Sequence, residues 1–358
     1  MKTRQLMKGN EAICRAAIDA GCQCFFGYPI TPQNQVPEYL SSLMPKHGRV
    51  FLQAESEVAA INMVYGAAGT GVRVMTSSSS PGISLKQEGI SYLAGAELPA
   101  VIINIQRGGP GLGNIAPAQS DYFQSTRGGG HGDYRTLVLA PASVQELYDF
   151  TRDAFELADK YRNPVIILAD AVLGQMMEPV LITRAPDPEP APQPWGTRGT
   201  RKGTRSVINS LYIVPEQLEA TNMRLAEKYA RMQREDVRWA EEAFSDDMDA
   251  VFVAYGSGAR ICRTAVKLLA AQGVKVGLFR PITLYPFPYQ QITALAGRVQ
   301  KIMAMELSLG QMVEDVRLAA EGRCPVEFYG RPGGIVPTPE EVAQGFLDGG
   351  MPLITQGL

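Results

Sequence analysis

Two acidic residues begin a segment of small side chains, residues 55–60 (ESEVAA). The preceding residues 50–52 are apolar enough for a short strand, and the alanines that follow favour a helix. A carboxylate at the start of such a helix would lie at the sheet edge where α/β proteins bind ligands. Glu57 is therefore a candidate for acid–base chemistry. The alternative is that Glu57 only stabilises the helix dipole, an effect of about 0.3–1 kcal/mol.

Three further polar loops are expected at the same edge. Residues 28–32 (YPITP) follow an apolar strand at 22–27, residues 77–80 (SSSS) follow a strand at 72–76, and Arg107 follows a strand at 100–106. Loops at the carboxyl ends of parallel strands converge on one crevice. Thr31 has a structural alternative, because it could cap a helix that begins at Pro32. Arg107 could bind a planar carboxylate with its guanidinium fork or form an ordinary loop salt bridge.

Residues 107–135 form a glycine-rich loop of unusual length, and such loops are usually functional. The loop also carries Arg127, His131 and Asp133. His131 could serve acid–base or interface roles. A single histidine is more often a structural hydrogen-bond partner, so we leave it outside the catalytic set.

Strands and helices alternate through the first half of the chain, and the strands are almost continuously apolar. This pattern predicts a parallel sheet covered on both faces. The expected strands are 22–27, 50–52, 72–76, 100–106, 136–139 and 165–169, and the expected helices are 10–21, 57–68, 83–96 and 144–160. A second α/β unit is expected from residue 249, with strands 250–254, 274–279, 301–305 and 326–329.

The segment between the two units differs in composition. Residues 185–194 (APDPEPAPQP) are typical of an extended linker, and residues 217–244 have a helical pattern that we expect to bridge the two units. The predicted division is residues 1–184, a linker and bridging helix at 185–246, and residues 247–358. The basic stretch 195–206, which includes the segment 198–205, is a solvated loop by default. Its alternative role is contact with a phosphate-bearing ligand such as coenzyme A.

Composition narrows the functional classes. The chain has 358 residues, 45% of them hydrophobic and 20% charged, with a formal net charge of −2. These values suggest a two-domain globular protein without a nucleic-acid or polybasic membrane surface. No apolar run approaches the ~20 residues of a membrane span, and the N-terminus lacks the apolar core of a signal peptide, so a cytoplasmic location is expected. Five cysteines lack metal-site spacing, so we expect reduced thiols.

Nucleotide-binding motifs are weak or missing. Residues 256–258 (GSG) after a strand hint at a phosphate site, but the G-x-G-x-x-G pattern is not completed. The sequence also contains no G-x-x-x-x-G-K-[ST] pattern, which argues against a P-loop NTPase.

Several of these motifs together resemble the α subunit of 2-oxoacid:ferredoxin oxidoreductases, which are thiamine-diphosphate enzymes. The resemblance covers essentially the whole chain. Its motifs are residues 27–32, 55–60, 76–82 and 106–108, then 256–258, 280–281, 286–288, Glu306 with 309–311, and 337–341. Residues 77–99 (SSSSPGISLKQEGISYLAGAELP) look most like the branched-chain type that uses 2-oxoisovalerate (3-methyl-2-oxobutanoate).

The resemblance implies a fold and a role for each candidate residue. The first unit would be a pyrimidine-type thiamine-diphosphate domain with a doubly wound parallel sheet, followed by a smaller domain like the transketolase C-terminal domain. Glu57 would hydrogen-bond N1′ of the aminopyrimidine ring, with Glu55 as the fallback. Thr31 and Arg107 would hold the 2-oxoacid, and Pro29 and Ser78 would contact the cofactor. Residues 77–80 and Leu112 are candidates for the pocket wall.

The resemblance also implies partners. The family binds the diphosphate and Mg²⁺ through a Gly-Asp-Gly motif on a β subunit, and in this chain Gly132-Asp133 is followed by Tyr134. The [4Fe–4S] clusters would lie on β or on a ferredoxin-like δ subunit, and a γ subunit would complete the complex. Coenzyme A would be the co-substrate and ferredoxin the electron acceptor. The chain alone is expected to be inactive.

Two alternatives stay open. The same chemistry could act on 2-oxoglutarate, which needs a second basic residue for its distal carboxylate. Residues 108–115 contain none, which favours an aliphatic substrate. The chain could instead be a non-catalytic assembly protein that has kept the fold, because a fold alone does not imply function.

Overall fold

The computed structural model describes residues 3–182, 193–197, 199 and 205–351. The first unit contains β1 (Thr3–Lys8), α1 (Gly9–Asp19), β2 (Cys24–Gly27), α2 (Gln35–Lys46), β3 (Val50–Gln53), α3 (Glu57–Gly69), β4 (Val74–Ser78), α4 (Ser80–Gly95), β5 (Ala100–Gln106), α5 (Tyr122–Thr126), β6 (Leu137–Leu139), α6 (Val144–Tyr161), β7 (Pro164–Asp170), α7 (Ala171–Gln175) and β8 (Met177–Ile182). The second part contains α8 (Pro215–Glu235), β9 (Trp239–Glu242), β10 (Ala250–Ala254), α9 (Gly256–Ala271), β11 (Val276–Pro281), β12 (Thr283–Tyr285), α10 (Tyr289–Ala296), β13 (Lys301–Glu306), α11 (Met312–Ala320), β14 (Val326–Gly330) and α12 (Pro339–Leu347).

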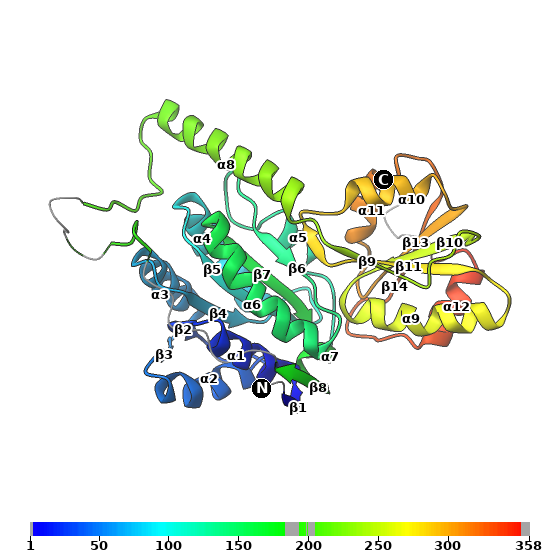
Figure 1. The fold of residues 1–358 in the computed structure, drawn as a ribbon, viewed down its shortest axis with the longest axis horizontal. Helices are drawn as coiled ribbons and strands as arrows, with labels where there is room; N and C mark the ends of the chain where they lie inside the picture. The colour runs from blue at the N-terminus through cyan, green and yellow to red at the C-terminus, as the bar shows by residue number, and fades with distance from the viewer. Residues whose placement is uncertain (1–2, 183–192, 198, 200–204, 352–358) are drawn as a thin grey trace.

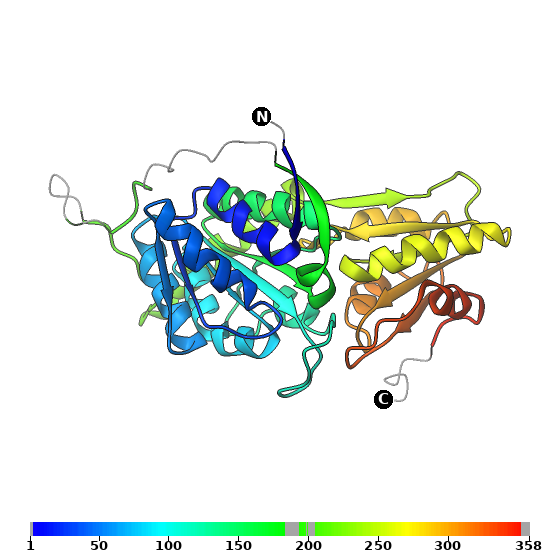
Figure 2. The same ribbon diagram turned by 90° about the horizontal axis from the view of Figure 1, so that it is seen from below.

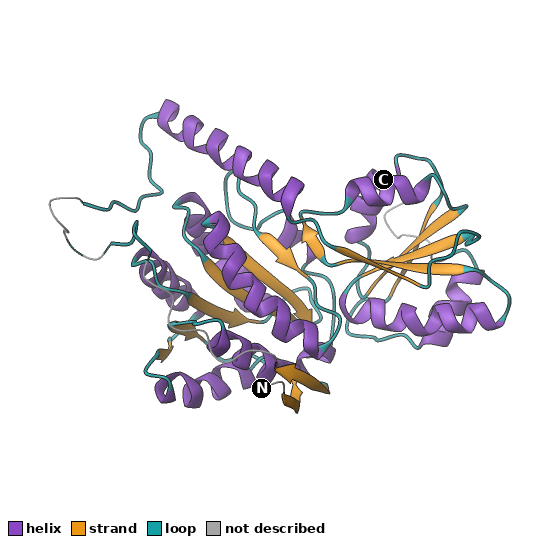
Figure 3. Ribbon diagram, in the orientation of Figure 1, coloured by secondary structure: helices purple, strands orange, loops and turns teal. Residues whose placement is uncertain are grey.

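Two α/β units lie side by side, each with a central sheet between helices (Figures 1 and 3). The first sheet has seven strands in the order β12-β6-β7-β5-β4-β2-β3, and the second has five in the order β14-β13-β10-β11-β9. A separate pair, β1 and β8, is antiparallel and visible at the N-terminus in Figure 2. The predicted α/β class with parallel sheets is confirmed.

Burial explains the apolar strands of the first unit. Every residue of β5 and β7 is buried, and the two strands pair in parallel along their whole length. Val101 and Ile102 point to opposite faces of the sheet and join separate apolar cores. A strand covered by helices on both faces needs apolar residues at every position, so it shows no alternation.

The two sheets exchange strands across the predicted boundaries. β12 comes from the range assigned to the second domain, yet it pairs antiparallel with β6 of the first sheet. β9 comes from the predicted bridging segment and pairs antiparallel with β11 of the second sheet. The helix expected at 217–244 therefore ends at Glu235, because the chain beyond it is needed for β9. The prolines at 185–192 lie outside the described residues.

Polar contacts fix the two units against each other. Arg280 makes two hydrogen bonds to the Glu146 carboxylate, at 2.7 and 2.8 Å. Asp315 accepts hydrogen bonds from the Tyr122 hydroxyl at 2.7 Å and from the Arg127 guanidinium at 3.2 Å. The start of α9 also faces the first unit, where the Ser257 hydroxyl donates to Asp170.

Two further features concern helix apolarity and the cysteines. Within the described ranges, no helix combines the length and the apolarity needed to cross a bilayer. All five cysteines are free thiols; four are buried and Cys24 is half-buried.

Candidate active site

Four neighbouring strands bring the candidate residues to one edge of the first sheet. In the sheet order β5-β4-β2-β3, Arg107 follows β5, Ser78 ends β4, Thr31 lies in the loop after β2, and Glu57 begins α3 after β3. All adjacent pairs among these strands are parallel. The convergence expected from the sequence is therefore present in the fold.

Glu57 is buried and sparsely bonded. It is the first residue of α3, after Ser56, whose hydroxyl accepts the N–H of Ala59 at 3.1 Å. The Glu57 side chain is held by the Ser78 hydroxyl, which donates to Oε1 at 3.3 Å. Glu57 is 5% exposed, whereas Glu55 is exposed to solvent. Burial and the contact with Ser78 thus distinguish Glu57 from the fallback residue.

A glycine on α4 makes room for the Glu57 carboxylate. A Cβ atom on Gly82 would lie 2.4 Å from Glu57 Oε1 and 2.0 Å from Ser78 Oγ. Both atoms are buried, and they are hydrogen-bonded to each other, so neither side chain can simply move away from the added Cβ atom. The position therefore requires glycine, and the carboxylate packs directly against the backbone of α4.

Thr31 does not begin a helix, which corrects the capping prediction. α2 starts at Gln35, and the Thr31 hydroxyl accepts a hydrogen bond from Asn34 at 3.1 Å. The carbonyl of Pro32 accepts from the Asn10 amide at 3.1 Å and the Gln175 amide at 2.7 Å. These tertiary bonds hold residues 28–33 as a loop over the sheet edge, so the local helix-start signal is overridden.

Arg107 points its guanidinium at backbone carbonyls. Its Nη1 donates to the carbonyl of Thr31 at 2.9 Å, and its Nη2 donates to the carbonyl of Leu112 at 3.0 Å. Arg107 is buried and forms no ion pair within the part of the chain that the structure describes, so the loop salt bridge is not what holds it. Its Nε is buried with no hydrogen-bond partner among those residues.

A residue that the sequence analysis missed connects the two halves of the site. The Ser77 hydroxyl donates to Gln33 Oε1 at 2.6 Å, and the Gln33 amide donates to the carbonyl of Tyr28 at 3.2 Å. Gln33 thus ties the end of β4 to the loop that carries Thr31. Its only signal in the sequence is its position just after the YPITP run.

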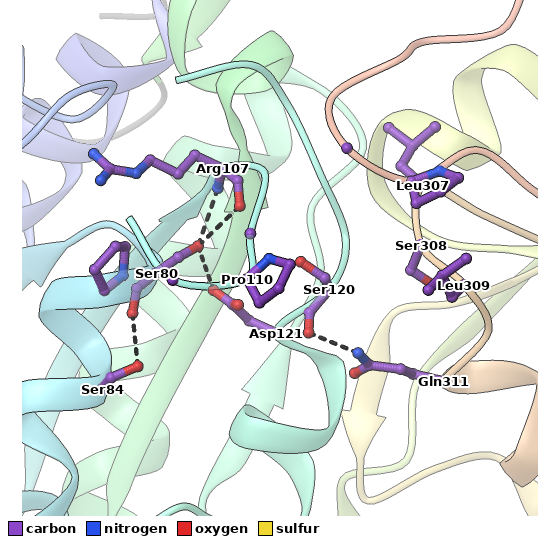
Figure 4. A pocket seen from close by; sticks show the side chains of 15 residues that line it. Ser80, Ser84, Arg107, Pro110, Ser120, Asp121, Leu307, Ser308, Leu309 and Gln311 are labelled. Carbon is purple, nitrogen blue, oxygen red and sulfur yellow. Dashed lines mark hydrogen bonds between the residues drawn. The ribbon is translucent and has the colours of Figure 1, made fainter. Parts of the chain in front are cut away.

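A cavity of about 430 Å³ adjoins this edge, where the two units meet (Figure 4). The first unit contributes Ser80, Ser120 and Asp121 to its wall, and the second contributes Ser308 and Gln311. Figure 4 shows the Arg107 guanidinium directed away from Pro110 and Ser120, so the cavity neighbours the Arg107–Thr31 contact and does not contain it.

Asp121 is the cavity's acidic group and was not anticipated. It accepts hydrogen bonds from the Ser80 hydroxyl at 2.6 Å and the Asn104 amide at 2.9 Å. Burial raises the pKa of Asp121, which these hydrogen bonds partly oppose. In the sequence it lies in the middle of the long loop with no motif to distinguish it.

The remaining predicted positions lie further out. Pro29 is exposed, and Leu112 is 80% exposed and contributes its carbonyl rather than its side chain. His131 is exposed and lines a separate cavity of about 180 Å³ with Tyr92 and Ser210. Most of the basic stretch at 198–205 falls outside the described residues.

The phosphate hint at residues 256–258 is wrong. The start of α9 is buried against the first unit, and Asp170 accepts hydrogen bonds there from the side chain and backbone of Ser257. A carboxylate already occupies the end of the helix that would attract an anion. Within the described ranges, no three His, Cys, Asp or Glu side chains gather as a metal site.

Comparison with known families agrees with this geometry. Residues 15–248 match the family described as pyruvate flavodoxin/ferredoxin oxidoreductase, thiamine diphosphate-binding, and residues 248–342 match core domain II of pyruvate:ferredoxin oxidoreductase. The chain belongs to the 2-oxoacid:ferredoxin oxidoreductase family. It is therefore a subunit of an oxidoreductase, and its first unit is a thiamine-diphosphate-binding domain, as the motifs predicted.

Similar proteins come from this family. The chain is 54% identical over 333 residues to a ketoisovalerate oxidoreductase subunit VorB of Methanothermobacter thermautotrophicus, covering 92% of this chain and 93% of that one. It is 36% identical over 368 residues to a 2-oxoglutarate synthase subunit KorA of the same organism, covering 96% and 98%.

A solved structure shares the whole fold. The 2-oxoglutarate:ferredoxin oxidoreductase from Magnetococcus marinus, with 2-oxoglutarate, coenzyme A and succinyl-CoA bound, superposes with a TM-score of 0.84 at 26% identity. The match covers 97% of this chain and 65% of that one, so this chain spans about two thirds of that structure's chain. A split-gene transketolase matches with a TM-score of 0.60 at 14% identity, which reflects the fold alone.

Proposed function

We propose that this chain is the α subunit of a complex that oxidatively decarboxylates a branched-chain 2-oxoacid to its acyl-CoA and passes the electrons to ferredoxin. The names of the relatives support the branched-chain substrate class. The relative named for ketoisovalerate is 54% identical to this chain, whereas the one named for 2-oxoglutarate is 36% identical. The observation that carries the proposal is the under-bonded, buried carboxylate of Glu57 at the converging strand ends.

The residues around Glu57 fit thiamine diphosphate. A buried carboxylate that accepts one long hydrogen bond keeps lone pairs for a further partner, and buried polar groups are normally satisfied. N1′ of the aminopyrimidine ring would be that partner, with Ser78 steadying the carboxylate and Pro29 on the neighbouring loop. When bound, thiamine diphosphate supplies the electron sink that stabilises the carbanion left by decarboxylation. Glu57 holds and moves the proton at the ring nitrogen, which is general acid–base work.

Arg107 and Thr31 are proposed to orient the 2-oxoacid. The guanidinium is buried beside the Thr31 carbonyl, and its Nε has no partner among the described residues. A carboxylate is the ligand that best matches such a fork. The bonds from Arg107 to the carbonyls of Thr31 and Leu112 fix the guanidinium before the substrate arrives.

The surrounding side chains favour an aliphatic substrate. Residues 108–115 contain no lysine or arginine. Arg107 is the one basic residue among the described residues that line the adjoining cavity, and Asp121 is also in that wall. A distal carboxylate such as that of 2-oxoglutarate would find no second cation there and would lie near Asp121, so the 2-oxoglutarate alternative is disfavoured.

Partner subunits complete the proposed site. Apolar side chains are exposed around the edge that carries Glu57: Tyr28, Val58, Leu85, Leu112 and Ile115. Groups of exposed apolar side chains often mark protein interaction sites. We assign this edge to a β subunit that holds the diphosphate and Mg²⁺, with γ and ferredoxin-like δ subunits and the [4Fe–4S] clusters beyond it. Coenzyme A would enter as the acyl acceptor.

Turnover of the complex purified with its native partners tests the proposal. Viologen reduction is followed with coenzyme A and a panel of 2-oxoacids for wild type, Glu57→Gln and the exposed control Glu55→Gln. We expect 3-methyl-2-oxobutanoate to be preferred, Glu57→Gln to abolish reduction and Glu55→Gln to retain it. A preference for 2-oxoglutarate would contradict the substrate class. Full activity of the Glu57→Gln complex would reject the catalytic assignment and leave the assembly-protein alternative.

A further inference from the structure

A lysine is buried in the helix interface beside Glu57. Lys86 lies in α4, one turn after Gly82, and its side chain is fully buried. Gly82 packs against Glu57, and a Cβ on Gly89 would lie 2.6 Å from Ile61 of α3. Residues at spacings of three and four share one helix face. Lys86 therefore lies on the face of α4 that meets α3, between the contacts made by its two neighbouring glycines.

The amine of Lys86 has no hydrogen-bond partner among the described residues. Helical side chains lean toward the start of their helix, so Lys86 is directed toward the turn of Gly82, against which the Glu57 carboxylate packs. A buried amine without a partner is costly in a folded protein. Burial lowers the pKa of Lys86 to about 8, and the Glu57 carboxylate opposes this shift.

Glu57 is the charged group that faces Lys86. β4 and β5, which pack on α4, carry no titratable side chain. The other carboxylates and the arginine near α4 have partners of their own, namely Asp170 with Ser257, Asp121 with Ser80 and Asn104, Glu88 with Tyr92, and Arg107 with the carbonyls of Thr31 and Leu112. Two phenols are also near: Tyr134 bonds Gln87, and Tyr65 lies on α3.

We infer that Lys86 is a positioning residue that acts through Glu57, holding this carboxylate in its charged form and in place beside the ring nitrogen. The inference rests on the proposed role of Glu57. A cation close to a carboxylate in a low-dielectric interior favours the charged form of the carboxylate. Methionine would fill the same space without an unpaired amine, so the lysine has a cost in stability that packing does not explain.

The first test compares the pH dependence of two variants in the assembled complex. In Lys86→Met, we expect the acid-side midpoint of kcat/KM to rise by about one pH unit because Glu57 loses its neighbouring cation. The acid-side midpoint for thiamine-diphosphate affinity should rise equally. Lys86→Gln should behave in the same way. Lys228→Met is the matched control. Lys228 of α8 is also a lysine with a pKa lowered to about 8 by burial, but its amine bonds Glu97 at 3.3 Å.

The second test needs no cofactor. In the full chain without partners, Lys86→Met should raise the urea midpoint more in a Glu57→Gln background than in wild type, because the lysine then has no counter-charge. Additive effects, or an unchanged acid-side midpoint in both Lys86 variants, would overturn the inference. Full turnover of Glu57→Gln would instead reject the proposed function, so the two failures are distinguishable.

Discussion

A buried glutamate lies at the carboxyl edge of each sheet, and the two are bonded very differently. Glu306 ends β13, and its carboxylate accepts the N–H groups of residues 311–313 at 2.9–3.2 Å and the Ser308 hydroxyl at 3.2 Å. Glu57 accepts one hydroxyl at 3.3 Å. Both are at most 5% exposed. Burial alone therefore does not distinguish the carboxylate that we propose as catalytic; the number of lone pairs left for a ligand does.

The buried lysines show the same contrast. Lys228 bonds Glu97 at 3.3 Å and the carbonyl of Arg162 at 3.2 Å. Lys86 has no hydrogen-bond partner among the described residues. In these two comparisons the sparsely bonded members, Glu57 and Lys86, lie where α3 meets α4, and Glu306 and Lys228 are bonded. Proteins retain such local costs mainly at functional sites.

The largest expected effect concerns stability at alkaline pH. The pKa of Lys86 is lowered to about 8, against about 10.4 in an unfolded chain. Between these values the Lys86 amine binds more protons in the unfolded chain than in the folded one, so Lys86 should contribute a rise of about 3 kcal/mol to the free energy of unfolding. Lys86→Met should lack the contribution of Lys86 to this rise when urea unfolding is measured from pH 7.5 to 10.5, whereas the similar contribution of Lys228 stays in both proteins. An equal rise in wild type and Lys86→Met would contradict the unpaired state of the amine.

The next effect tests the close approach at α4. Gly82→Ala places a Cβ within 2.4 Å of the Glu57 carboxylate, which must move. A misplacement of about 1 Å in a catalytic group can cost about 100-fold in rate, so we expect turnover of the complex to fall about 100-fold. Gly66→Ala is the matched control, since a Cβ there meets nothing within 4 Å and stabilises α3 by about 0.5–1 kcal/mol. Equal turnover in the two variants would show that the position of Glu57 is unimportant.

A smaller effect on stability is expected from a substitution of Glu306, the glutamate whose carboxylate accepts several hydrogen bonds. Glu306→Gln replaces one carboxylate oxygen with an amide that faces backbone N–H groups, which lose their acceptor. We expect a loss of about 2 kcal/mol in the free energy of unfolding, measured with urea. Turnover per folded complex should stay within a few-fold of wild type. A variant with unchanged stability would remove the contrast between the two glutamates.

The smallest effect concerns the substrate contact. Arg107→Lys keeps the charge but loses the planar fork, so it cannot bond both the Thr31 and Leu112 carbonyls and a carboxylate. We expect KM for the 2-oxoacid to rise about tenfold, equivalent to about 1.4 kcal/mol, with a smaller change in kcat. An unchanged KM would mean that Arg107 only fastens the loop.

The sequence was sufficient for the order of the main strands and helices, because continuous apolar strands and helix caps are local signals. The strands β1, β8, β9 and β12 were not predicted. The strand at 250–254 was predicted with its observed bounds, and residues 338–341, part of a motif singled out in the sequence, form a capping box at the start of α12. The loop at Thr31 was misread as a helix start because Asn10 and Gln175, distant in sequence, bond the Pro32 carbonyl. Strand exchange between the sheets likewise depends on pairing that no local pattern encodes.

The same contrast between local signals and long-range contacts applies to the candidate site. Glu57, Thr31 and Arg107 could be placed at one edge because strand ends converge. Lys86 was missed because a lysine in a helix normally faces solvent. Its one signal is the pattern Gly82-x₃-Lys86-x₂-Gly89, which marks a close-packed helix face. Which of two nearby glutamates is buried, and how many bonds it accepts, required the three-dimensional packing.

The most direct test compares Glu57→Gln with Glu306→Gln in the assembled complex, with turnover and urea unfolding measured on the same preparations. We predict that Glu57→Gln lowers turnover at least about 100-fold while its unfolding midpoint stays near wild type. Glu306→Gln should lower the midpoint and keep turnover. Retained turnover in Glu57→Gln, or lost turnover in a fully folded Glu306→Gln complex, would contradict the assignment of the under-bonded carboxylate as the catalytic one.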